Sequence, residues 1–102
     1  MIPKKISDLI AELRKRTEEG QIIWHYDDNQ SAVVLENAKF SLSITYRFDE
    51  VEEVGRFNLK YTDHANRKDY FFSTTQLYDD YNQVRLLFDS AQSSDLNVDM
   101  DF

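Results

Sequence analysis

A strict alternation of apolar and polar residues from Phe40 to Phe48 constrains the fold of this chain more than any other feature. The apolar side chains at positions 40, 42, 44, 46 and 48 share one side of an extended chain, and the polar side chains between them share the other. Such a strand belongs in an antiparallel sheet that buries one face and leaves the other in water. The polar side consists of Ser41, Ser43, Thr45 and Arg47.

Further segments have the composition of strands in the same sheet. Residues 21–26 and 32–35 are rich in β-branched and aromatic residues, and the turn-forming residues 27–30 separate them. Residues 57–62 alternate in the same way as the central strand, and residues 70–72 are expected to form the last strand. These patterns predict an antiparallel meander of about four strands.

An amphipathic helix is predicted before the strands, from Ile6 to about Glu19. Its apolar residues, at positions 6, 9, 10 and 13, are spaced by three and four, which places them on one side of a helix. Pro3 suits a helix start, where its missing N–H costs little. Gly20 suits the left-handed residue that closes a helix.

A second helix is expected to begin at Ser73, Thr74 or Thr75, since each can cap a helix N-terminus with its hydroxyl. It should continue to about Ala91. Its apolar stripe is predicted to consist of Leu77, Tyr81, Val84 and Phe88, widened by Tyr78 and Leu87.

Each helix and the sheet therefore have one apolar face to bury. An α+β two-layer sandwich satisfies them together, with an antiparallel β-meander and the N- and C-terminal helices packed on one face. The element order is α-β-β-β-(β)-α. At 102 residues the chain fits one domain, predicted over residues 1–94, followed by an acidic and apolar tail over residues 95–102.

The charge of the chain narrows the classes of partner. Nineteen acidic residues against twelve basic ones give a net charge of −7, which disfavours direct binding to nucleic acid or to an anionic membrane. The distribution is uneven, because residues 1–16 contain five bases and two acids, a local balance of +3. No apolar run is long enough to span a membrane, and we expect a cytoplasmic protein.

No constellation of catalytic or metal-binding residues is visible. The two histidines, His25 and His64, have no ligand spacing around them, and there is no cysteine. Two glycines are too few for a P-loop or a dinucleotide-binding turn. The oxygen-rich Asp27–Asn29 segment lacks the spacing of a calcium loop and is interpreted as a turn. We expect no enzyme activity and no cofactor.

Two sets of residues are candidates for partner binding. The first is the polar side of the central strand, Ser41, Ser43, Thr45 and Arg47, which is either an ordinary wet sheet face or a flat binding or dimer surface. The second is the tail, in which Leu96, Val98, Met100 and Phe102 alternate with polar residues, three of them Asp. The tail is a frayed terminus, a final strand on the protein's own sheet edge, or a peptide that adds to the edge of a partner.

Short aromatic signatures add a resemblance. Gly20-Gln-Ile-Ile-Trp24 after the first helix and Thr75-Gln-Leu-Tyr78 before the last one, in this order of elements, resemble small bacterial or phage-borne proteins with an α-β-meander-α layout. The resemblance implies the same fold and a microbial source. It assigns no activity to any residue.

The sequence thus favours a non-enzymatic protein-interaction domain of inhibitor or immunity type. The candidate partners are another protein, in particular a basic one, and a second copy of the chain. One alternative is an acidic mimic of nucleic acid that binds a DNA-binding protein. Another is a protein that binds a small ligand with its aromatic cluster, which consists of Trp24, Tyr26, Tyr46, Tyr61, Tyr70, Tyr78 and Tyr81.

Overall fold

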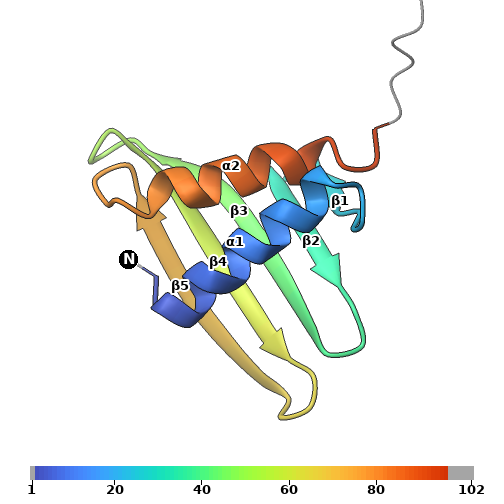
Figure 1. Cartoon of the computed structure of the whole chain (residues 1–102). Coiled ribbons are helices and arrows are strands. Elements are labelled where there is room, and N and C mark those ends of the chain that lie inside the picture. Colours follow the sequence, from blue (N-terminus) through green and yellow to red (C-terminus); the bar gives the residue numbers. More distant parts are fainter. Residues whose placement is uncertain (1, 97–102) are drawn as a thin grey trace, which may run out of the picture.

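The computed structural model describes residues 2–96 of the chain (Figure 1). Its elements, in order, are α1 (Lys4–Glu18), β1 (His25–Asp27), β2 (Ala32–Glu36), β3 (Phe40–Asp49), β4 (Val54–Asp63), β5 (Lys68–Thr75) and α2 (Tyr81–Gln92). The strands form one antiparallel sheet in the order β1-β2-β3-β4-β5, and both helices lie on the same face of it. This confirms the predicted α+β two-layer sandwich.

The sheet has five strands and not the expected four, because both short segments before Phe40 pair as strands. His25 pairs with Val34, and Asp27 pairs with Ala32. Only the second half of the predicted strand 21–26 takes part, since β1 begins at His25.

The alternation along β3 is confirmed by burial and register. Leu42 and Ile44 are fully buried under the helices, whereas Ser43 lies opposite Lys60 on the face that the helices leave open. Phe48 is an exception, because 57% of its surface is exposed. The β3–β4 hairpin extends past α2 in Figure 1, so the helix layer does not cover this end of the strand.

Helix α1 follows the sequence-based expectation closely. Pro3 is its N-terminal cap residue, and Ile10 and Leu13 of the apolar stripe are buried. Gly20 has a φ of 77°, in the left-handed region that glycine adopts without a steric penalty, and its N–H donates to the carbonyl of Thr17 at 3.1 Å.

The predicted start of the second helix is wrong. Ser73, Thr74 and Thr75 are the last residues of β5, paired with β4, and α2 begins only at Tyr81. The hydroxyl residues continue a run of strand-forming residues, and pairing with β4 outweighs their capping preference. Leu77 and Tyr78 consequently lie in the turn before α2, where 73% and 48% of their surfaces are exposed.

A chain of hydrogen bonds ties the segment before β1 to α1. The indole Nε1–H of the buried Trp24 donates to Thr17 Oγ1 at 2.9 Å. The Thr17 hydroxyl in turn donates to the carbonyl of Leu13 at 2.7 Å. The indole N–H is therefore satisfied in the core by a hydroxyl that is itself buried.

Thr17→Val keeps the shape of the side chain and removes the acceptor for this indole. We expect it to lower the free energy of unfolding by about 1–3 kcal/mol, because it leaves a buried donor without a partner. Urea unfolding followed by the fluorescence of Trp24, the only tryptophan of the chain, measures the loss. Thr17→Ser is the control that keeps the hydroxyl, and a valine variant as stable as wild type would contradict the assignment.

Gly55 allows the phenol groups of Tyr46 and Tyr81 to approach the backbone of β4 closely on the face that the helices cover. A methyl group at this position would lie 2.8 Å from the phenol oxygen of Tyr46 and 2.9 Å from that of Tyr81. Burial raises the pKa of the Tyr81 phenol above its ordinary value. The two phenol groups therefore fill space that any side chain at position 55 would need.

Gly55→Ala should lower the free energy of unfolding by about 1–3 kcal/mol, the usual effect of overpacking. Adding Tyr46→Phe removes one of the crowding oxygens, so the double variant should recover part of the loss. A double-mutant cycle of chemical unfolding measures this coupling, and strictly additive effects would show that the phenol oxygen does not limit the space.

Candidate functional site

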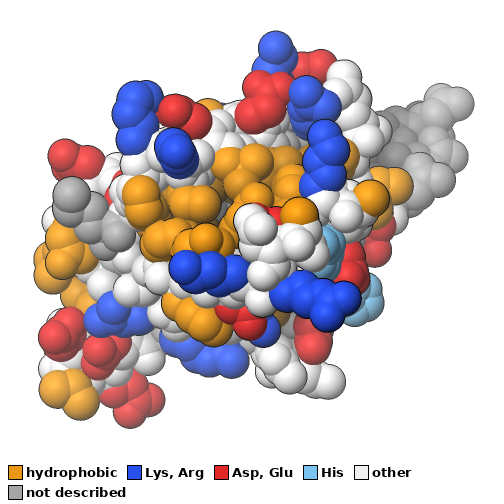
Figure 2. All heavy atoms as spheres, turned by 90° about the horizontal axis from the view of Figure 1, so that it is seen from below, with side chains coloured by type: hydrophobic (Ala, Val, Ile, Leu, Met, Phe, Trp, Pro, Cys, Tyr) orange, Lys and Arg blue, Asp and Glu red, His pale blue; other side chains and the backbone are white. Residues whose placement is uncertain are grey.

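An open apolar groove lies between the first turns of α1 and the β4–β5 hairpin. We call it the α1–β5 groove. Its volume is about 770 Å³, and it is lined by Pro3, Lys5, Ile6, Leu9, Tyr61, Asp63, Tyr70 and Phe72. Figure 2 looks into this side of the molecule and shows a hollowed hydrophobic surface with both basic and acidic side chains around it.

Aromatic rings from three adjacent strands form the floor of this side of the sheet. Phe40 of β3 stacks on Tyr61 of β4 with ring centroids 5.4 Å apart. Tyr61 pairs directly with Tyr70 of β5, and their centroids are 6.3 Å apart. These three rings are only half-buried.

Hydrogen bonds to α2 and its preceding turn hold α1 above this floor. Ser7 Oγ donates to Gln83 Oε1 at 2.8 Å, and Gln83 Nε2 donates back to the carbonyl of Ser7 at 2.8 Å. The backbone N–H of Ile2 donates to Asp80 Oδ2 at 2.8 Å, and the Thr74 hydroxyl bonds the other oxygen of that carboxylate. The start of α1 is therefore tied to α2 and to the end of β5, which leaves Ile6 and Leu9 facing the groove.

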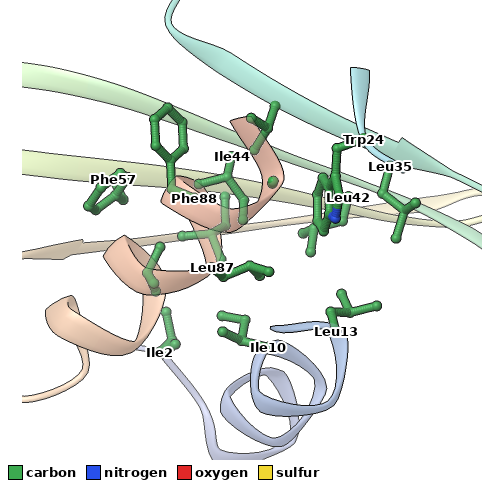
Figure 3. Close-up of a cluster of buried hydrophobic side chains, with 14 residues drawn as sticks. Ile2, Ile10, Leu13, Trp24, Leu35, Leu42, Ile44, Phe57, Leu87 and Phe88 are labelled. Atoms are coloured by element: carbon green, nitrogen blue, oxygen red, sulfur yellow. The ribbon is translucent and has the colours of Figure 1, made fainter. Parts of the chain in front are cut away.

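The core behind the groove is closed. Figure 3 shows Ile10 and Leu13 of α1 pointing toward Leu42 and Trp24, with Leu87 of α2 beside them. Ile10, Leu42 and Leu87 are fully buried. Along α1, Ile6 and Leu9 thus line the groove, while Ile10 belongs to the core.

Charged groups stand at the margin of the groove. Lys5 lines it directly, and Lys68 Nζ lies over the ring of Tyr70, 5.1 Å from its centroid. Asp63 is the acidic member. It accepts from Asn66 Nδ2 at 2.8 Å and from the backbone N–H of Ala65 at 3.0 Å. The hydrogen bond from Asn66 lowers the pKa of this carboxyl, so Asp63 is an ionised group that forms the hairpin turn.

The polar residues predicted as a binding face lie together on the open face of the sheet. Ser41, Ser43 and Thr45 are half-buried there, opposite Thr62, Lys60 and Asn58 of β4. Arg47 is exposed, and its guanidinium donates to the carbonyls of Gln30 and Tyr46 at 2.6 and 2.8 Å. Their role in binding stays a prediction.

Sequence reasoning missed the most exposed aromatic residue of the open face. Phe71 of β5 has 71% of its surface exposed, and Lys60 Nζ lies 6.0 Å from its ring centroid. It belongs to a run of three aromatic residues, so alternation alone places it on the side opposite Tyr70 and Phe72.

The predicted tail falls mostly beyond the part of the chain that the structure describes. Leu96 is described, with 64% of its surface exposed. Val98, Met100 and Phe102 lie outside the described residues.

The two histidines lie in different elements, a strand and a turn. His25 is exposed on β1, and its side chain lies on the face opposite the half-buried Tyr26. His64 Nε2 lies 3.9 Å from Glu36 Oε1 near the β4–β5 turn. Between residues 2 and 96 no group of three His, Cys, Asp or Glu side chains could hold a metal ion. No helix in the same range is long and apolar enough to cross a membrane.

The aromatic residues predicted to bind a small ligand do not gather at one site in the structure. Trp24 is buried in the core, Tyr78 is exposed, and only Tyr61 and Tyr70 line the α1–β5 groove. Comparison with protein-family models, with known proteins and with solved structures finds no match to the chain. The bacterial or phage origin implied by the sequence resemblance stays a prediction.

Two isoleucines one turn apart on α1 test whether the groove is open. Ile10→Ala should lower the free energy of unfolding by about 2–5 kcal/mol, as expected for a fully buried aliphatic residue. Ile6→Ala should lower it by less than half as much, because its side chain is already partly in water. Thermal or urea unfolding of both variants measures the difference, and equal losses would show that the groove is part of a closed core.

Proposed function

We propose that this protein is a non-enzymatic binding domain whose partner is another protein, and that the α1–β5 groove holds an apolar segment of that partner. The observation that carries the proposal is an apolar groove, lined by Ile6, Leu9, Tyr61, Tyr70 and Phe72, whose side chains the fold leaves only half-buried. Contiguous exposed apolar surface of this kind is typical of interaction sites. A cytoplasmic location remains the expectation from the sequence.

The shape of the groove favours a protein segment over a small molecule. Small-ligand sites usually bury most of the ligand surface, whereas this groove opens to solvent along one side (Figure 2). The side of the occupant that faces away from an open groove stays in contact with solvent or with the rest of the partner. A folded partner or a peptide with one polar side meets this condition. The polar groups at the margin, Lys5 and Asp63, can then orient such a segment.

The paired acids argue against the nucleic-acid mimic. On α1, Lys4 lies 3.2 Å from Asp8, Arg14 lies 3.0 Å from Glu18, and Arg16 lies 2.9 Å from Glu12. Further acid–base pairs are Arg56 with Asp49 and Glu52, Lys60 with Asp69, and Arg85 with Asp89. A mimic needs a face of unpaired negative charge to resemble a phosphate backbone.

Leu9→Gln tests the proposal, because it puts an amide into the groove at a half-buried position. The matched control is Phe71→Gln, which makes a similar change on the open face. We expect a protein partner captured from lysate of the source organism by wild type to be retained by the Phe71 variant. The Leu9 variant should bind it about tenfold to a hundredfold more weakly, the loss expected for one buried leucine. Titration calorimetry with the purified partner measures the ratio.

The salt dependence of the capture separates the alternatives. A partner held in the groove should survive high salt, since apolar burial is not screened. Equal capture by both variants would reject the groove. Loss with Phe71→Gln alone would instead place the interaction on the open face, and release by salt alone would favour the nucleic-acid mimic.

A further inference from the structure

The edge strand β5 forms one wall of the α1–β5 groove. It is eight residues long and pairs with β4 on one side only. Its first two residues, Lys68 and Asp69, are charged, as is usual for natural edge strands. The stretch from Tyr70 to Thr74 carries no charge and no proline. Tyr70 and Phe72 face the groove, so an added strand would continue the sheet and the groove floor together.

Helix α1 leaves room for the side chains of such a strand. Its first turn lies over the β5 end of the sheet in Figure 1, and its residues Ile6 and Leu9 line the groove together with Tyr70 and Phe72 of β5. An extended segment beside β5 would turn every second side chain toward this side of the sheet. The groove therefore requires an occupant with apolar residues at alternate positions.

The segment Leu96–Phe102 has this pattern. Leu96, Val98, Met100 and Phe102 alternate with Asn97, Asp99 and Asp101. With the apolar side chains turned toward the groove, the polar ones turn toward the open face of the sheet, where Lys60 lies beside Phe71. The acidic side chains of the segment would then lie on the face that carries Lys60, whose charge they complement.

The C-terminal segment begins beside β1 and not beside β5. Trp24, directly before β1, donates its backbone N–H to Ser94 Oγ at 2.7 Å. Four strand spacings separate β1 from β5, a distance of about 19 Å. The last described residues therefore lie at the sheet edge opposite β5, which favours the β5 edge of a second copy as the place where the segment adds.

We propose that residues 96–102 of one copy add as a strand to the β5 edge of a second copy and place their apolar side chains in its α1–β5 groove. This rests on the proposed function of the groove and names a second copy of the chain as its partner. The interaction is strand addition at a sheet edge, in which backbone pairing supplies affinity and the alternate side chains supply specificity.

Paramagnetic relaxation between two differently labelled samples tests the proposal with the full-length chain. Asn97→Cys introduces the only cysteine, on the polar side of the segment, and receives a nitroxide. This chain is mixed with isotope-labelled wild type. The amide signals of Ile6, Leu9 and Phe72 in the labelled copy should lose half their intensity or more. Sedimentation of wild type should show a mass rising above 12.1 kDa as concentration increases.

Two variants provide the controls. A nitroxide at Glu50→Cys, in the exposed β3–β4 turn, should leave the same signals unchanged. Val98→Ser with Met100→Ser in the spin-labelled chain should abolish the broadening while the core signals keep their positions. Broadening that is absent in the mixed sample, or that falls on His25–Asp27 of the isotope-labelled copy instead of on the residues of the groove, overturns the proposal.

The outcome is distinguishable from failure of the proposed function. If the mixed sample shows no broadening and Leu9→Gln still loses a protein captured from lysate, the second copy is excluded and the groove remains a binding site for another protein. If neither effect is seen, both proposals are rejected.

Discussion

Both helices cover the same face of the sheet, and the rest of the structure depends on how they share it. Helix α2 buries Val84, Leu87 and Ala91 completely and lies close to the strands. Helix α1 packs mainly against α2 and is fixed to it by the reciprocal hydrogen bonds of Ser7 and Gln83. A helix held from the side in this way covers the sheet unevenly, and the uncovered part lies at β4 and β5.

The uncovered apolar surface is not a sign of a poorly built core. Within the described residues no buried side-chain nitrogen or oxygen lacks a hydrogen-bond partner, and even the indole of Trp24 has one in Thr17. A scaffold that satisfies its buried polar groups so completely keeps a defined shape. The half-buried rings of Tyr61 and Tyr70 are thus carried by a fold whose buried polar side chains are satisfied throughout the described residues.

The sequence is most informative where local pattern and tertiary packing agree. The alternation around Leu42 and Ile44 and the stripe of Ile10 and Leu13 identify the core because each has a single period. The start of α2 could not be found in this way, because Thr74 and Thr75 suit both a strand and a helix cap, and only pairing with β4 decides between them. The α1–β5 groove could not be predicted from the sequence either. Ile6 and Ile10 belong to one stripe, and only the placement of α1 on α2 separates a groove residue from a core residue.

The fold places many of the charged side chains of the chain in acid–base pairs. Many surface acids are neutralised by bases one helical turn away or on the adjacent strand, so the net charge of −7 does not form a uniform negative field. The margin of the α1–β5 groove includes Lys5 and Lys68, and the carboxylate of Asp63 is occupied by its own turn. Under the proposed function, apolar contact in the groove supplies the attraction. In the proposed strand addition the polar residues of the segment face the open side of the sheet, where acidic side chains complement Lys60 and basic ones would meet it as a like charge.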